Sequence, residues 1–241
     1  MEGLERPDKV DPQSETIQTD KSTSYTEPGI EGLVADWSSD RQTFDLPWGK
    51  LMMWIFLLSD TFIFSIFLTG YMNVRLSQTD NWPNPSEVFA LEIAGQHLPL
   101  LLIAIMTFAL ITSSGTMAMA VNFAYAGNKR KTVILMTITA ILGASFVGMQ
   151  AFEWTKLIVE EGVRPWSNPM GAAQFGSIFF MITGFHGLHV TAGVIYLSII
   201  ARKVARGDYE KKGYAIVEIT GLYWHFVDLV WVFIFAFFYL W

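Results

Sequence analysis

Ionisable side chains inside long apolar segments are the residues of this sequence that could exchange protons or bind a metal. Three of them lie in the last apolar segment and recur at helical spacing, so they share one helix face: Glu218, His225 and Asp228. A charged residue at the centre of a membrane costs roughly 2.5–3.5 kcal/mol and nearly always faces the interior of a helix bundle. The closing segment is therefore expected to contact partners elsewhere in the chain.

Two other segments carry ionisable residues at a matching depth. His186 and His189 are three positions apart in the fourth segment, and Asp60 lies in the first. At ~1.5 Å per residue, Asp60, His186 and His225 each lie ~18 Å into helices of alternating direction, so they could converge. Asp60 is either a carboxylate that exchanges protons or contacts lipid, or a buried acid hydrogen-bonded to a neighbouring helix.

Near the outer boundary of the third segment, Glu153 is expected to pair with another helix or with water.

Histidines inside a membrane also suggest a metal or haem site. Imidazole and carboxylate suit copper and zinc, so ligation by the set His186, His189, His225 and Asp228 is chemically reasonable. One haem between His225 and either of the other two is a further alternative. Histidine–carboxylate hydrogen bonds explain the same residues equally well. We therefore predict no catalytic, cofactor-binding or metal-binding residue, and an intramembrane polar seam of Glu153, His186, His189, Glu218, His225 and Asp228.

Five apolar segments position these residues, each at or above the ~20 residues needed to cross a bilayer. They cover residues 48–75, 97–125, 131–157, 174–202 and 213–241. Every proline lies outside the segment interiors, where helix starts and connections tolerate it. With 52% hydrophobic and 16% charged residues, the predicted fold class is all-α, an integral membrane bundle of five transmembrane helices.

Small and hydroxyl residues in two segments are suited to close helix packing. The run 112–116 in the second segment reads TSSGT, and its hydroxyls can bond back to their own helix. In the third segment Gly143 and Gly148 offer a face for close approach of another helix. We expect packing rather than chemistry from both.

The first 47 residues differ from the rest of the chain. They are polar, rich in acids, and contain Pro7, Pro12 and Pro28. Residues 1–47 are predicted to be a largely disordered cytoplasmic arm before a five-helix domain at 48–241.

The chain has no Cys, which excludes disulfides, thiolate metal sites, iron–sulfur clusters and Cys nucleophiles. No nucleic-acid motif is present, so no nucleic-acid partner is expected.

The distribution of basic residues predicts the orientation. The loop at 128–131 and the loop at 202–212 are strongly basic, whereas residues 76–96 contain no Lys or Arg and 158–173 contain only Arg164. Basic loops face the cytoplasm in membrane proteins. The N-terminus is therefore predicted to be cytoplasmic and the C-terminus periplasmic.

Two motifs carry a resemblance to a known family. They are Phe185-His186-Gly187-Leu188-His189-Val190 and Tyr223-Trp224-His225-Phe226-Val227-Asp228, the second followed by Trp231. With them, residues 48–241 resemble subunit III of haem–copper respiratory oxidases, the family of cytochrome c oxidase and the cytochrome o quinol oxidases. Supporting matches are Trp82-Pro83, the basic turn 127–131, and 150–154, which reads QAFEW.

The resemblance implies an accessory role in a larger complex. Subunit III of that family binds no haem or copper, holds phospholipids in a cleft, and supports proton uptake and sustained turnover. This chain has the polar arm in place of two N-terminal helices, as expected for the five-helix form. A Glu commonly occupies the position of Asp60 in the family, which makes Asp60 the candidate lipid or proton carboxylate.

The expected function is that of a non-catalytic subunit III of a bacterial haem–copper terminal oxidase, which reduces oxygen to water in aerobic respiration. Its expected location is the inner membrane. It is expected to contact subunit I directly, and its other expected partners are subunit II, further oxidase subunits and phospholipids. Haem and copper would lie in the catalytic subunit. Two alternatives stay open: an accessory membrane subunit of nitric oxide reductase, and a haem- or copper-ligating membrane enzyme. A small transporter using Asp60 and Asp228 as a proton relay is less favoured, because broken helices are not evident.

Overall fold

The computed structural model describes residues 48–78, 82–84, 88–93, 96–169, 171–209 and 213–240. These residues belong to one compact unit, Pro47–Trp241. The predicted cytoplasmic arm at 1–47 lies outside the described residues, so its disorder stays a prediction.

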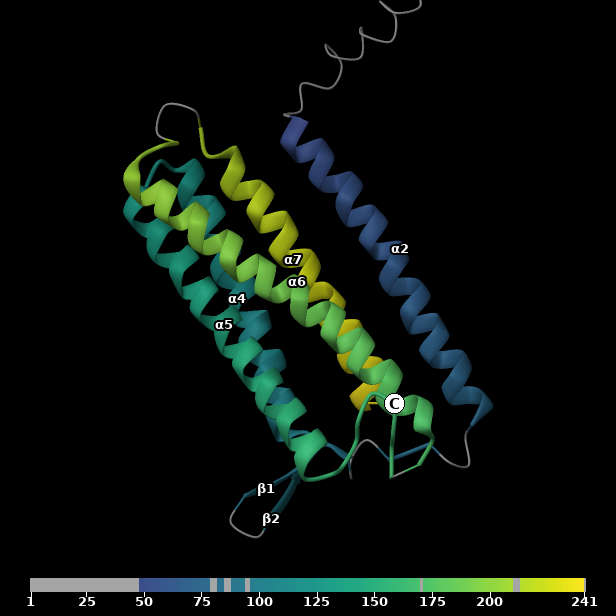
Figure 1. Ribbon diagram of the computed structural model, residues 1–241. Helices are drawn as coiled ribbons and strands as arrows, with labels where there is room; N and C mark the ends of the chain where they lie inside the picture. The colour runs from purple at the N-terminus through teal and green to yellow at the C-terminus, as the bar shows by residue number, and fades with distance from the viewer. Residues whose placement is uncertain are drawn as a thin grey trace, which may run out of the picture. The chain divides into compact units, whose positions relative to one another are not determined.

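Five helices long and apolar enough to cross a membrane make up most of the described chain (Figure 1). They are α2 (Trp48–Ser77), α4 (Leu101–Tyr125), α5 (Lys129–Val159), α6 (Ala173–Arg206) and α7 (Ala215–Phe235). A short π-helix, η2 (Ala236–Leu240), continues α7. Each predicted segment coincides with one of these helices to within a few residues, which confirms the predicted five-helix membrane bundle.

The connection between α2 and α4 contains an antiparallel hairpin that the sequence analysis did not predict. Strand β1 (Ala90–Ile93) pairs with β2 (Gln96–Pro99), with Ala90 opposite Pro99. Leu100 then turns the chain with a φ of 60°, and α4 begins at Leu101 rather than at 97. The apolar run is continuous from Leu98 onward, and hydropathy alone does not separate a short strand from the first turn of a helix.

Local sequence explains where two of the helices begin and end. Asn128 precedes α5, and its side-chain oxygen accepts a hydrogen bond from the Lys131 amide at 3.3 Å. Gly207 follows α6 with a φ of 88°, a conformation that glycine adopts without the steric penalty of a side chain, and its amide bonds back to the Val204 carbonyl at 3.0 Å. Each of the two basic stretches thus contains a residue suited to starting or ending a helix.

Helix α7 is the most buried of the five spans and lies against α4, α6 and α2. Its Trp224 and Trp231 are fully buried and two turns apart, so they project from one face. The indole N–H of Trp224 donates to Ser113 Oγ, and that of Trp231 donates to Thr107 Oγ1, both at 3.0 Å. Two tryptophans therefore fasten α7 to α4.

Glycines on α5 and α6 make room for Trp224. A Cβ atom at Gly143 would lie 2.8 Å from Val194 Cγ2, and closer still to the indole of Trp224. A Cβ atom at Gly193 would lie 3.0 Å from Trp224 Cζ3. The predicted close approach is therefore confirmed at Gly143. It does not occur at Gly148, where an added Cβ would meet no atom of the described chain within 4 Å.

Helix α2 lies at the side of the bundle, against α7 and α6 (Figure 1). The hydroxyl of Tyr71 donates to the Phe237 carbonyl at 3.0 Å, and Arg75 Nη1 donates to Tyr71 Oη at 3.0 Å. Phe237 lies in η2 near the end of the chain, where helical carbonyls lack partners within their own helix. The last turns of α2 are thereby tied to the end of the chain.

Gly143→Ala is expected to destabilise the protein by about 1–3 kcal/mol, because the new methyl group must displace the buried indole of Trp224. Gly148→Ala on the same helix is the matched control and should leave stability nearly unchanged, because its methyl group meets open space. Thermal unfolding of the purified protein in detergent measures both. Equal losses in the two variants would show that the Trp224 contact does not limit stability.

Candidate functional site

Asp60 of α2 and His189 of α6 form a buried polar contact near the middle of the bundle. Asp60 is 4% exposed, and its Oδ2 lies 2.8 Å from His189 Nε2, although the ring is not aligned for a linear hydrogen bond. The other ring nitrogen, Nδ1, lies 2.8 Å from the Phe185 carbonyl. A carbonyl only accepts, so Nδ1 carries a proton. One further proton, on Nε2 or on Oδ2, would allow a hydrogen bond between these two atoms, and with either placement the pair would carry no net charge.

Aromatic rings enclose this pair. The ring centroid of His189 lies 4.7 Å from that of Phe185 and 5.7 Å from that of Phe64 on α2. The two phenylalanine rings are themselves 5.4 Å apart. Tyr223 of α7 donates its hydroxyl to the His189 carbonyl at 2.9 Å. The pair is therefore shielded by α2 and α6 and fixed to α7.

His186 lies one turn from His189 but has different neighbours. Its side chain is fully buried, stacked on Trp231 with centroids 5.5 Å apart, and it faces the edge of Phe146 at 5.9 Å. Neither ring nitrogen has a hydrogen-bond partner among the described residues. Asp60 and His186 were expected at the same depth in the membrane. Asp60 contacts His189 instead of His186.

His225 and Asp228 lie where α7 meets α4. His225 Nδ1 is 2.6 Å from Ser114 Oγ. The same hydroxyl lies close to the Asp228 carboxylate, which is 9% exposed and whose Oδ1 lacks a hydrogen bond within the described part of the chain. Ser114 thus connects the two ionisable groups of α7 to α4. The sequence analysis treated Ser114 only as a packing residue.

Glu218 lies near the start of α7, away from these central contacts. Its Oε1 is 2.5 Å from Lys50 Nζ on α2, and its Oε2 accepts a hydrogen bond from the Tyr125 hydroxyl on α4. A single carboxylate therefore joins three helices. Lys50 lies near the start of α2 and Glu218 near the start of α7, and both helices begin on the same side of the membrane. Counting residues from the start of each helix would therefore have predicted this ion pair.

Glu153 belongs to a further contact near the opposite end of the bundle. It is 4% exposed and accepts hydrogen bonds from Gln150 Nε2 at 3.0 Å and from the Tyr239 hydroxyl at 3.1 Å. Tyr239 lies in η2, so Glu153 ties α5 to the end of the chain. No sequence signal singled out Tyr239, because aromatic residues occur throughout the closing segment.

The residues predicted as one polar seam therefore occupy several separate contacts. Among the described residues none of the six forms a hydrogen bond or ion pair with another, and their partners are Lys50, Asp60, Ser114, Tyr125, Gln150 and Tyr239. Each contact joins the ends or faces of particular helices. Structural roles for these residues stay a prediction that stability measurements can test.

The described residues contain no group of three or more His, Cys, Asp or Glu side chains placed to hold a metal ion. His189 faces Asp60, His186 faces Trp231, and His225 faces Ser114. The three histidines do not converge on one position. That this chain carries no cofactor stays a prediction.

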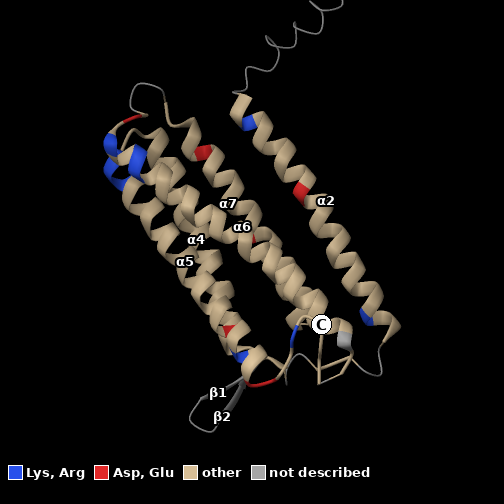
Figure 2. Cartoon of the chain, in the orientation of Figure 1, with Lys and Arg blue, Asp and Glu red and all other residues tan. Residues whose placement is uncertain are grey.

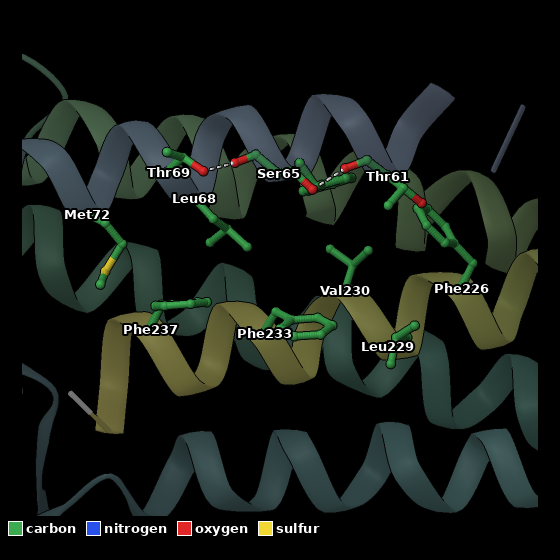
Figure 3. A pocket seen from close by; sticks show the side chains of 11 residues that line it. Thr61, Ser65, Leu68, Thr69, Met72, Phe226, Leu229, Val230, Phe233 and Phe237 are labelled. Carbon is green, nitrogen blue, oxygen red and sulfur yellow. Dashed lines mark hydrogen bonds between the residues drawn. The ribbon is translucent and has the colours of Figure 1, made fainter. Parts of the chain in front are cut away.

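An apolar groove of about 480 Å³ opens between α2 and α7 (Figure 3). Phe64, whose ring packs against that of His189, is one of its lining residues. The hydroxyls of Thr61, Ser65 and Thr69 line it, but each donates to a carbonyl of its own helix at 2.7–2.8 Å. Leu68 and Phe233 face it from the two helices. The groove therefore offers apolar surface and few free donors.

The groove has polar contacts at both ends. It begins next to Asp60, at Thr61, and ends at Met72 and Phe237, next to the Tyr71 contact. The α2 residues that line it span roughly 16 Å of helix, about half the hydrocarbon thickness of a bilayer. Its length thus matches one leaflet.

Comparison with known proteins identifies the family. The sequence profile described as cytochrome c oxidase subunit III matches residues 42–241. The probable quinol oxidase subunit 3 of Staphylococcus saprophyticus is 31% identical over 197 residues, which cover 82% of this chain and 90% of that protein. The cytochrome c oxidase subunit 3 of Alkalihalophilus pseudofirmus is 31% identical over 195 residues, which cover 79% and 85% respectively. The chain belongs to the cytochrome c oxidase subunit III family.

Membership confirms the resemblance seen in the sequence and makes this chain a multi-pass membrane subunit of an oxidase complex. The two motifs that carried the resemblance hold the central contacts of this subunit III. The first contains His186 and His189, and the second contains Trp224, His225 and Asp228. Both motifs lie where α6 and α7 contact their neighbours.

Ser114→Ala and His225→Leu test the contact between α4 and α7. Each is expected to lower the free energy of unfolding by about 1 kcal/mol, within the range measured for hydrogen bonds between membrane helices. The double variant should lose less than the sum, because both changes remove the same contact. Thermal unfolding of the purified protein gives all three values.

Ser145→Ala is the matched control for that cycle. The Ser145 hydroxyl is exposed and donates only to its own helix, at the Leu142 carbonyl, so its removal should have little effect. Strictly additive losses for Ser114→Ala and His225→Leu would mean that the two side chains do not stabilise each other.

Proposed function

We propose that this chain is the non-catalytic subunit III of a bacterial haem–copper terminal oxidase that reduces oxygen to water in the inner membrane. It contacts the catalytic subunit I directly, with subunit II and other oxidase subunits as further partners. Haem and copper reside in the catalytic subunit, and the reaction belongs to the complex. Family membership supports this assignment, and the Asp60–His189 pair is the observation that carries the specific role.

The Asp60–His189 pair is suited to holding a proton inside the membrane. It retains one proton between Oδ2 and Nε2, and moving that proton from one atom to the other leaves the net charge unchanged. Transfer from Oδ2 to Nε2 converts a neutral acid and imidazole into an adjacent carboxylate–imidazolium ion pair, so no unpaired charge is left in a low-dielectric interior, where it would be costly. We infer that this pair supports proton uptake and sustained turnover of the complex while it fixes α2 to α6.

The groove between α2 and α7 is suited to one acyl chain of a phospholipid. Its walls are apolar, and its length matches one leaflet (Figure 3). Arg75 lies at the end of α2 where that leaflet meets water, at the level of a lipid phosphate. We infer that a bound phospholipid covers the Asp60–His189 pair from the bilayer side.

The ends of the helices differ in charge, and this supports an orientation. Figure 2 shows Lys and Arg gathered where α5 begins and α6 ends. By their positions in the helices, that end carries Lys50, Lys129, Arg130, Lys131, Arg202, Lys203 and Arg206, whereas the other end of the described chain carries Arg75, Lys156 and Arg164. By the positive-inside rule the first end is cytoplasmic, which places the start of α2 inside and the end of α7 on the periplasmic side.

Purification of the tagged chain in mild detergent tests the proposal. We expect a haem-containing catalytic subunit to co-purify with both the wild-type chain and Asp60→Asn, because an Asn amide can still donate to Nε2 of a neutral His189. The Asp60→Asn complex should start with normal oxidase activity and then lose it faster during turnover, and it should retain less phospholipid. Oxygen consumption over time and lipid mass spectrometry measure the two effects.

Asp60→Glu is the control, because it keeps a carboxylate that can hold the proton, and it should restore sustained activity. Failure of Asp60→Asn to assemble would make Asp60 architectural. Stoichiometric haem or copper in the isolated chain would overturn the non-catalytic assignment.

Single cysteines test the orientation, because the natural chain contains none. Ala126→Cys lies in an exposed loop at the basic end, and Ser167→Cys lies in an exposed loop at the opposite end. A maleimide that does not cross membranes is expected to label Ser167→Cys in intact cells, and Ala126→Cys only after the membrane is opened. The reverse pattern would invert the proposed topology.

A further inference from the structure

A second groove, of about 240 Å³, lies between α5 and α6 at the basic end of the bundle. Val133, Thr137 and Ala140 line it from α5. Ser198, Ala201 and Ala205 line it from α6 at helical spacing, together with Arg202. It shares no residue with the groove between α2 and α7, and it lies in the opposite half of the membrane-spanning region.

The walls of this α5–α6 groove present an apolar surface, because their hydroxyl groups are already hydrogen-bonded within their own helices. The Thr137 hydroxyl donates to the Val133 carbonyl at 2.8 Å, and the Ser198 hydroxyl donates to the Val194 carbonyl at 2.7 Å. The alanines on both helices keep the groove open, because larger side chains would fill it. Nothing in these walls selects a polar ligand.

Arg202 is the charged residue among the groove-lining side chains. It is exposed, and its guanidinium forms no hydrogen bond or ion pair with the described residues. The same end of the bundle carries further basic side chains, which Figure 2 shows gathered around the ends of α5 and α6: Arg130, Lys131, Lys203 and Arg206. No Asp or Glu is among the described residues that line the groove. An apolar slot thus leads to an arginine that has no ion-pair partner in the described part of the chain and that lies within a basic surface.

We propose that the α5–α6 groove binds an anionic phospholipid, with an acyl chain between the helices and the phosphate on Arg202. A guanidinium binds phosphate through two parallel hydrogen bonds, which a flexible ammonium group does not match. Basic pockets between membrane helices on the cytoplasmic side take anionic headgroups. The surrounding Lys and Arg residues favour a headgroup with net negative charge over a zwitterionic one.

A transmembrane helix from another subunit is the rival occupant, because small residues also allow close helix approach. Such a helix would bury the Arg202 guanidinium against apolar side chains. Burial of an unpaired charge is costly, whereas a lipid supplies both the chain and the counter-charge. The charge distribution therefore favours the lipid.

Thermal unfolding of the purified oxidase complex in mixed micelles tests the proposal, with dioleoyl phosphatidylglycerol titrated against dioleoyl phosphatidylcholine. A ligand that binds only the folded state raises the unfolding temperature, so the titration yields an apparent affinity. The anionic lipid should stabilise the wild-type complex more strongly than the zwitterionic one. Arg202→Gln should weaken the effect about fivefold, the expected contribution of one basic residue at an anionic membrane surface.

Matched variants separate this site from general charge attraction. Lys203→Gln removes a neighbouring charge that does not line the groove and should weaken binding much less, while Arg202→Lys should restore part of it. Ala205→Phe narrows the groove without changing charge and should also reduce the stabilisation.

Four results would overturn the proposal: equal stabilisation by the two lipids, equal effects of Arg202→Gln and Lys203→Gln, undiminished binding in Ala205→Phe, or a cross-link from Ala205→Cys to another subunit.

Discussion

The insertion of two tryptophans from α7 between its neighbours is the contact on which the rest of the bundle depends. Lipid offers no hydrophobic force that would drive helices together, so close packing and hydrogen bonds between helices must do so. Trp224 fills the space left by Gly143 and Gly193, and Trp231 packs on Phe146 and His186. Both indoles donate to hydroxyls of α4. Helix α2 then lies against a face of α7 whose position these contacts have already set.

Several ionisable groups of the bundle have local partners rather than one shared network, whereas His186 has no hydrogen-bond partner among the described residues. Glu218, Glu153 and His225 each find a partner on a neighbouring element within hydrogen-bond distance. Lys50 balances the charge of Glu218, whereas Glu153 and His225 meet uncharged hydrogen-bonding groups. Because they share no partner, changes at one pair should have little effect on the others.

The sequence predicted the helices well because an apolar run of sufficient length has few other uses. Counting depth also singled out Asp60 and the two histidines of α6. Depth does not give the direction in which a side chain points around its helix, so it did not separate His189 from His186 as the partner of Asp60. Ser114 and Tyr239 escaped notice because hydroxyl and aromatic residues are common in these segments. The hairpin before α4 escaped because its strands are short and merge into an apolar run.

The shape of the groove between α2 and α7 sets the way in which a bound chain can leave. Thr61, next to Asp60 in the sequence, lines one end of the groove, and Met72 and Phe237, next to the Tyr71 contact, line the other. Its exposed residues, such as Ser65 and Phe233, open sideways onto the bilayer. The phospholipid proposed for this groove would therefore leave sideways into the bilayer. Its exchange would then depend on the side chains along this open edge rather than on a separation of α2 from α7.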